Sequence, residues 1–315
     1  MSLKHESVAG NYGIVFILFL LLLIFSTLAP SFMSIATIVN ISRQIATIGI
    51  CAVGMTFVML SGGIDFSIGS LLALINIVCA KLIVEHGINP INAVLICFII
   101  AVIVGSINAF WITVVNIPPL ITTLGMMTIL RGLAYVLSGG HAIWGFSNTF
   151  RAVGRGYIGV FPIPFIIMFA MFIFGWFFLT RTRFGRFVYG IGGSESAAKQ
   201  AGINVTRMKY FVYVICSVLT ALAGILLLSR LNAGLPKTGS GLEMEVVTAV
   251  VLGGVSIYGG KGSIVGVFLE VVIMGVLTNG MTYLNVTEHV QLVIRGLVLL
   301  VAIGLDNISK KAHIS

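Results

Sequence analysis

The chain has 315 residues, of which 58% are hydrophobic and only 9% are charged, and its mean hydropathy is +1.14. Because soluble domains carry about 25% charged residues, this composition excludes an ordinary soluble protein and predicts one that crosses a membrane several times. The net charge of +9 does not indicate nucleic-acid binding, since the basic residues are scattered between apolar segments and form no stripe with aromatic residues.

The apolar segments predict a bundle of transmembrane helices. A hydrocarbon core about 30 Å thick requires roughly 20 apolar residues per helix, and lipid admits only helices or closed barrels. We expect one all-α transmembrane domain, residues 1–315, with about ten spans at 13–31, 40–61, 66–84, 91–115, 119–137, 161–179, 210–230, 244–259, 264–283 and 289–306. The first is expected to be an uncleaved helix. Pro118 and Pro119 fix the entry to the fifth span. The fifth and eighth spans are short and rich in glycine or threonine, so each is a full span, a re-entrant segment or a broken helix.

Basic residues set the expected orientation of these spans. An even number of spans places both termini on one side, and Lys4, Lys310 and Lys311 lie near those termini. The densest basic cluster lies in the segment 180–209 and consists of Arg181, Arg183, Arg186, Lys199, Arg207 and Lys209. Because Lys and Arg concentrate in cytoplasmic loops, we predict that this segment and both termini are cytoplasmic.

The sequence lacks the common motifs for catalysis and nucleotide binding. The sequence has no HExxH or GxSxG pattern, and its four cysteines lie singly in apolar runs, as core residues do. The stretch "GGKGS" at 259–263 is not a Walker A loop, because Val255 stands where glycine is required and Gly262 follows the lysine. We therefore expect a protein that is not an enzyme, has no ATP site of its own and binds no metal.

Two glycine-rich stretches echo each other, "AVGMTFVMLSGGIDFSIG" at 52–69 and "AVVLGGVSIYGGKGSIVG" at 249–266. The echo indicates either a structural repeat, which is common in transporters, or shared turn chemistry at two helix hairpins. In the first stretch, Asp65 is positioned to cap the third span, and the alternative is a role in gating or partner contact.

The stretch "GIGGSESAAKQAGINV" at 190–205 interrupts the apolar sequence. Ser194 can cap a helix, Glu195 suits its first turn, and Gly202 can end it in a left-handed conformation. The sequence thus predicts a helix of one to two turns. Such a helix is either a solvated connector between spans or a small docking element for a partner.

Charged residues inside apolar segments are candidates for function by default. Arg131 lies well inside the fifth span, and Glu243 and Glu245 at the predicted outer start of the eighth are its candidate partners. Glu270 and Arg295 form a second candidate pair. A structural ion pair is the alternative explanation for each.

Four stretches together resemble the ribose-type permeases of bacterial ABC importers for simple sugars: "LSGGIDFSIGS", "PPLITTLGMMTILRG", "GIGGSESAAKQAGINV" and "EMEVVTAVVLGGVSIYGGKGSIVG". The resemblance covers about residues 35–306, in order and with matching spacing. It implies a multi-pass subunit of the bacterial inner membrane, embedded in lipid and paired with a second permease chain, identical or paralogous. Separate ATP-binding subunits would supply ATP and Mg²⁺, and a periplasmic or lipid-anchored sugar-binding protein would deliver substrate.

The resemblance also implies residue roles. The short loop helix matches the family's contact with the ATPase, which assigns coupling to Gly193, Ser194, Glu195, Ala197, Ala198 and Gly202. The family often has Asp where Glu245 stands, and both are acidic. Because sugars are neutral polyols, a pathway needs hydrogen-bonding side chains, and the candidates inside or beside spans are Asn108, Thr122, Thr123, Arg131, Glu243, Glu245, Asn279 and Thr282.

Other functions stay open on the sequence alone. A stand-alone secondary transporter would use Arg131, Glu270 and Arg295 as an ion relay. An ABC permease for an autoinducer sugar or a branched-chain amino acid would share much of the pattern, and a non-transporting scaffold is a further alternative. The sequence does not name the sugar.

Overall fold

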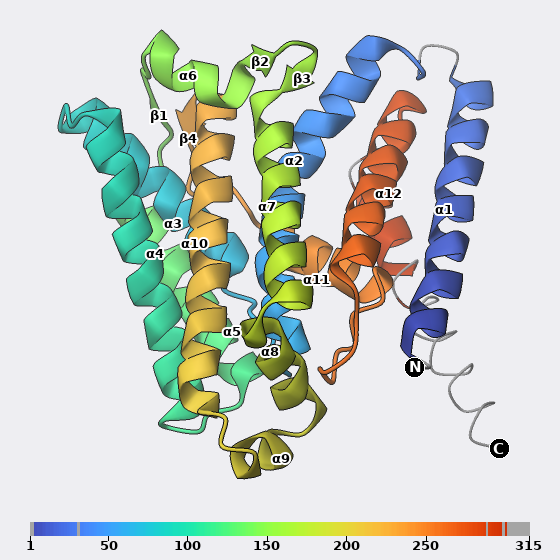
Figure 1. Ribbon diagram of the computed structural model, residues 1–315. Coiled ribbons are helices and arrows are strands. Elements are labelled where there is room, and N and C mark those ends of the chain that lie inside the picture. Colours follow the sequence, from blue (N-terminus) through green and yellow to red (C-terminus); the bar gives the residue numbers. More distant parts are fainter. Residues whose placement is uncertain (1–2, 30–31, 288, 298–299, 301–315) are drawn as a thin grey trace.

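The computed structural model describes residues 3–29, 32–287, 289–297 and 300, with side chains from residue 15 onward (Figure 1). The helices are α1 (Leu3–Leu28), α2 (Ile35–Leu60), α3 (Ile68–Ala80), the π-helix η1 (Lys81–Glu85), α4 (Pro90–Thr113), α5 (Pro119–Ser138), α6 (Asn148–Arg155), α7 (Ile163–Arg181), α8 (Arg183–Gly193), α9 (Glu195–Gln200), α10 (Val205–Leu231), α11 (Leu242–Leu252) and α12 (Ile264–Tyr283). The strands are β1 (Ile143–Trp144), β2 (Tyr157–Ile158), β3 (Phe161–Pro162) and β4 (Ala233–Gly234).

Within the described residues, seven helices are long and apolar enough to cross a membrane: α2, α3 with η1, α4, α5, α7, α10 and α12. In α1 the apolar portion, Val15–Leu28, is shorter. The fifth predicted span is a full-length helix, and it begins at the two prolines that the sequence singled out, Pro118 at the N-cap and Pro119 in the first turn. The tenth predicted span lies partly outside the described residues, of which 289–297 are helical.

The eighth expected span, 244–259, which the sequence left open between a full and a re-entrant segment, is not a full-length helix. Helix α11 has only 11 residues, which is about 16 Å at 1.5 Å per residue and half the thickness of a hydrocarbon core. The chain then leaves the helix at Gly253 and turns through 253–263 before α12 begins. The glycines of this segment, which made its character ambiguous in the sequence, end the helix early.

The described chain is mostly helical, as the all-α fold class requires, with two pairs of short strands in addition. Strand β1 pairs antiparallel with β4, and β2 pairs antiparallel with β3. Together with α6, these short strands form the end of the molecule opposite α9 (Figure 1). Each strand has two residues, too few to give the alternating pattern by which strands are recognised in a sequence.

Helices α2 and α10 form the centre of the bundle. From Ile45 to Leu60, almost every residue of α2 is buried, and α2 packs against α7, α10, α11 and α12. Small residues bring the central helices close, since a side chain at Gly54 would meet the backbone of Cys216. All four cysteines are free and buried, which confirms that they are core residues.

The ends of the bundle agree with the predicted arrangement of the loops. The amino-terminal end of α1 lies at the same end of the molecule as α8 and α9 (Figure 1). Segment 180–209 and the start of the first helix are thus on one side, as an orientation with both in the cytoplasm requires.

Candidate functional site

The predicted loop helix is present as α9. The Ser194 hydroxyl accepts a hydrogen bond from the Ala197 backbone N–H at 3.3 Å, which satisfies one of the free donors of the first turn. Glu195 lies in that turn, and Gly202 ends the segment with φ of 81°. The sequence prediction of a capped helix with a left-handed stop is therefore confirmed.

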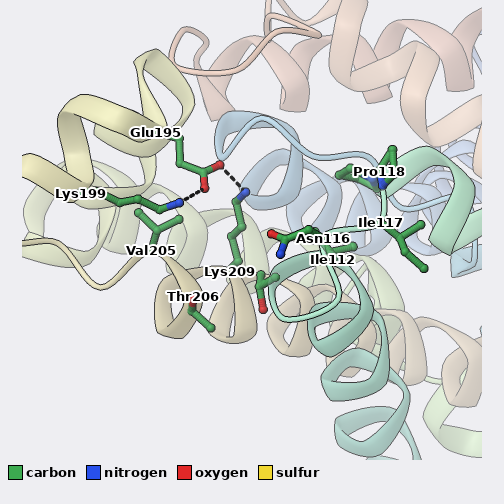
Figure 2. Close-up of a pocket in the computed structure, with 11 residues that line it drawn as sticks. Ile112, Asn116, Ile117, Pro118, Glu195, Lys199, Val205, Thr206 and Lys209 are labelled. Atoms are coloured by element: carbon green, nitrogen blue, oxygen red, sulfur yellow. Dashed lines mark hydrogen bonds and ion pairs between the residues drawn. The ribbon is translucent and has the colours of Figure 1, made fainter.

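Glu195 fastens α9 to the start of α10. Its carboxylate lies 2.9 Å from Lys199 Nζ and 2.7 Å from Lys209 Nζ, one lysine to each oxygen (Figure 2). The hydrogen bond from Lys209, and then that from Lys199, lowers the pKa of Glu195 below its ordinary value. Lys209 is the more buried partner, with 16% of its side chain exposed against 62% for Lys199. The pair with Lys209 therefore holds α9 in place more firmly.

The exposed face of α9 differs from the one expected. Ala198 is buried and packs with Ile191 and Val205, so this residue anchors α9 to α8 and α10 and presents no surface to a partner. The other residues assigned to coupling are exposed or half-buried: Gly193, Ser194, Glu195, Ala197 and Gly202. Of the two alanines, only Ala197 lies on the outside.

A pocket of about 200 Å³ lies beside this helix, between α9 and α10 on one side and the α4–α5 connection on the other (Figure 2). Glu195, Lys199 and Lys209 line it on one side. The opposite wall comes from the end of α4 and the prolines that start α5, through Ile112, Thr113, Asn116, Ile117, Pro118 and Pro119. The ion-paired helix thus adjoins the entry to the fifth span.

Glycines join the α8–α9 segment to the two echoing stretches. A Cβ on Gly192 would collide with the Leu60 carbonyl and the Gly260 nitrogen, and a Cβ on Gly259 would lie 2.8 Å from the Cα of Gly62. These three chain segments therefore meet backbone to backbone. Gly62 and Gly259, at equivalent positions of the echo, have φ of 82° and 88°. The two stretches thus share a left-handed glycine in the turn, although α2 continues to Leu60 and α11 ends earlier, at Leu252.

Arg131 has different partners from those expected. Its Nη1 donates hydrogen bonds of 2.8 Å to the carbonyls of Pro236 and Thr238, in the irregular segment before α11. Among the described residues it forms no ion pair with Glu243 or Glu245. Backbone carbonyls outside regular helices need such partners, so Arg131 supports the unwound segment that leads into the half-length helix.

The second pair of intramembrane charges is also corrected. Arg295 forms an ion pair with Glu245 and donates a 3.2 Å hydrogen bond to the Thr278 hydroxyl. Glu270, its expected partner, is buried at 6% exposure and has no ion-pair partner in the part of the chain that the structure describes. Glu243 accepts a hydrogen bond from the Gly241 N–H at the start of α11.

Asn108 and Thr123 each form a hydrogen bond to the buried α2–α3 connection. Asp65, fully buried, accepts hydrogen bonds from the Ser67 N–H at 2.9 Å and the Ser67 hydroxyl at 2.5 Å. It therefore closes the turn before α3, but the prediction that it caps this helix is wrong, because the N-cap residue is Ser67 and makes no side-chain capping bond. Asn108 donates to the same hydroxyl at 3.1 Å, and Thr123 donates to the Ile64 carbonyl at 3.4 Å. Sequence reasoning did not assign Asp65 to this cluster, because Asn108 and Thr123, which join the Asp65–Ser67 turn, are distant from it in the sequence.

The predicted pathway residues therefore lie in separate places. Asn279 donates to Gln44 at 2.5 Å, across α12 and α2, and Thr282 donates to the Thr278 carbonyl of its own helix. The Thr122 hydroxyl is buried without a partner in the described structure. The candidates group as Asn108 with Thr123, Arg131 beside the segment before α11, Glu243 and Glu245 on α11, and Asn279 with Gln44.

Residues 37–303 match a family model described as "Branched-chain amino acid transport system / permease component". The chain belongs to this family. The permease is 44% identical over 291 residues to the ribose import permease protein RbsC of Bacillus subtilis (strain 168), with 92% of this chain and 90% of that protein covered. It is 39% identical over 296 residues to RbsC of Escherichia coli (strain K12), covering 92% and 91%, and 34% identical over 304 residues to the D-allose transport system permease protein AlsC of the same strain, covering 96% and 93%. No solved structure matches the chain.

These relatives confirm the resemblance that the four sequence stretches indicated. The permease is a multi-pass membrane protein, with seven membrane-capable helices in its described part and permeases as its relatives. A secondary transporter and a non-transporting scaffold are not favoured.

Proposed function

We propose that the permease is the membrane-spanning subunit of an ATP-driven importer for a ribose-like monosaccharide in the bacterial inner membrane. The observation that carries this proposal is the 44% identity to a ribose import permease over 92% of the chain. The relatives named for D-allose and L-arabinose transport support a simple sugar as the substrate class. The whole chain, residues 1–315, acts as one permease domain in this proposal.

A separate ATPase supplies the energy and docks on the exposed face of α9. The sequence offers no Walker A loop, and α9 presents the small side chains of Ser196 and Ala197. Small residues allow close approach of a partner's groove, and the ion pair of Glu195 with Lys209 of α10 fixes the position of α9. ATP and Mg²⁺ are bound by that partner.

Two permease chains line the pathway, and a sugar-binding protein outside the membrane delivers the substrate. The amide and hydroxyl groups of Asn108, Thr122, Thr123 and Asn279 offer hydrogen bonds to a polyol. Arg131, Glu243 and Glu245 surround the unwound segment before α11, where an interrupted helix provides backbone groups for the same purpose.

Reconstitution tests this function. The permease is placed in proteoliposomes with candidate ATPase and sugar-binding proteins from the same genome, and uptake of radiolabelled ribose, allose and arabinose is measured. Uptake is expected to require ATP, the binding protein and an intact Walker lysine in the ATPase, and to favour ribose. Uptake that persists without the ATPase, or that an ionophore abolishes while ATP is present, would overturn the proposal.

A matched pair of substitutions tests the docking face. Ala197→Trp adds bulk to α9, whereas Ala152→Trp makes the same change at an exposed residue of α6, at the opposite end of the molecule. Capture of the ATPase by the purified permease is expected to fall at least tenfold for the first variant and to stay unchanged for the second. Equal capture by both would contradict docking on α9.

A further inference from the structure

Three arginines from separate helices meet at the end of the molecule opposite α9. Arg43 of α2 donates to the Arg155 carbonyl at 3.2 Å, Arg155 at the end of α6 donates to the Arg230 carbonyl at 2.7 Å, and Arg230 of α10 donates to the Arg43 carbonyl at 2.9 Å. The contacts form a closed ring of three. They hold the three guanidinium groups in one place and tie the ends of three helices together.

These arginines line an open cavity of about 570 Å³, which we call the arginine cavity. Its lining consists of Asn40, Arg43, Gln44, Arg155 and Arg230, so every lining residue is polar, three are cationic and none is acidic. None of the three arginines has an ion-pair partner within the described residues. The cavity is therefore a concentration of positive charge that the described chain leaves uncompensated.

The carbonyl contacts explain the position of the arginines but not their charge. A guanidinium has five N–H donors, and each of these three uses one or two on backbone carbonyls. The Nε of Arg43 is buried without a partner, and its guanidinium lies 4.5 Å from the centre of the Tyr157 ring. Neutral donors would serve the same carbonyls, whereas clustered charges in a partly buried place call for an anion.

We propose that the arginine cavity receives acidic side chains of the extracytoplasmic protein that delivers the sugar. This inference rests on the proposed function, which requires such a partner at this end of the molecule. A neutral monosaccharide has no need of three positive charges, whereas carboxylates pair with guanidinium groups in bidentate fashion. Charges at an interface also speed encounter and fix its register, which suits a partner that must dock and leave in each cycle.

Arg155 is the residue to change first, because it is exposed and lies at the rim of the cavity. Arg151 provides a matched control, since it is on the same short helix, bonds to Asn148 and does not line the cavity. Binding of the sugar-binding protein to the permease in nanodiscs is measured at 50 and 300 mM salt. We expect Arg155→Gln to weaken binding at low salt at least tenfold and to flatten the salt dependence, with Arg151→Gln unchanged.

Two further experiments test the inference even if Arg155→Gln does not fold. In the wild type, binding is expected to weaken severalfold between the two salt concentrations, and replacing the binding protein's surface carboxylates one at a time with lysine should identify at least one that abolishes binding. Arg155→Glu should restore binding to that lysine variant. Unchanged affinity and salt dependence in Arg155→Gln, or salt-independent wild-type binding, would overturn the inference.

Two other anion sources are distinguished in the same assay. A protein carboxylate is supported as the occupant if the binding protein stays bound in 10 mM inorganic phosphate and in nanodiscs that contain phosphatidylglycerol. Thermal stabilisation of the permease by phosphate or by phosphatidylglycerol, lost in Arg155→Gln while binding-protein affinity is unchanged, would instead assign the cavity to that anion. ATPase capture through α9 is measured alongside, because its retention shows that the importer function stands even where this docking inference fails.

Discussion

The backbone N–H of Gly260 donates a 2.9 Å hydrogen bond to the carbonyl of Leu60, which joins the loop before α12 to the carboxyl end of α2. Gly192 of α8 packs against both groups with no side chain between them. The segment that carries α9 therefore bears directly on the backbone of the bundle's central helix. A displacement of α9 by a partner would reach α2 and α12 through this glycine contact.

Gly192→Ala tests that contact. A methyl group has no room beside the Leu60 carbonyl, and the obstacles are backbone atoms that cannot rotate away. We expect a loss of about 1–3 kcal/mol in stability, the usual cost of overpacking, together with weaker coupling of ATP hydrolysis to transport. Thermal unfolding in detergent and ATPase stimulation by substrate measure the two effects.

Gly190→Ala is the matched control for that substitution. Gly190 lies on the same helix as Gly192 and has open space where the new methyl group would project, so the melting temperature of this variant should equal or slightly exceed the wild-type value. A similar loss in both variants would show that helix α8 responds to substitution in general and that the glycine contact has no special role.

The ion pairs of Glu195 predict that the stability of the protein depends on pH in the acid range. Since the pKa of this carboxyl is lowered in the folded protein by Lys209 and Lys199, the stability that the pairs add is fully present above the ordinary pKa of 4.5 and is lost as the pH falls through the lowered value. The carboxylate is 42% exposed, so the effect is about 0.2–1 kcal/mol.

Glu195→Gln should remove this loss of stability below pH 4.5, as seen in the difference between its unfolding curve and that of the wild type. Lys209→Gln should lower the free energy of unfolding at neutral pH more than Lys199→Gln does, because Lys209 is the less exposed of the two lysines. Parallel pH profiles for wild type and Glu195→Gln would contradict the assignment.

Arg131→Met should destabilise the unwound segment before α11. The substitution leaves the carbonyls of Pro236 and Thr238 without their 2.8 Å partner, and each buried unpaired carbonyl costs about 1–3 kcal/mol. The melting temperature of the variant and its rate of sugar uptake should both be lower than in the wild type. Thr128→Val, at an exposed position of the same helix, should change stability by less than about 0.5 kcal/mol, and a comparable loss there would argue against the carbonyl contacts as the cause.

Glu245 and Glu270 should respond differently to the same substitution. Glu245→Gln breaks the pair with Arg295 and leaves a largely buried guanidinium without its counter-charge, at a cost of up to about 3 kcal/mol. Glu270→Gln removes a buried carboxyl that has no ion-pair partner in the described structure, so stability should be unchanged or higher. A double-mutant cycle of Glu245→Gln with Arg295→Met measures the coupling energy, and additive losses would refute the pair.

Local signals in the sequence predicted local structure well. Ser194, Glu195 and Gly202 defined α9, and Pro118 and Pro119 marked the start of α5, because capping and backbone restriction act within a few residues. The eighth span stayed open between a full and a re-entrant segment for a related reason. Its apolar composition continues past Leu252, and composition records how much of a segment avoids water but not where glycines end its helix.

The sequence alone determined that this protein crosses a membrane many times, that it has no Walker A loop, and that a short capped helix interrupts a basic loop. These properties follow from composition and from contacts between near neighbours. Only the tertiary structure decided that Ala198 faces inward, that Glu245 and not Glu270 pairs with Arg295, and that Arg43, Arg155 and Arg230 share one cavity. Ala198 packs against residues of the two neighbouring helices, and the other contacts join residues 50 to 187 positions apart. All of them depend on how the helices pack together.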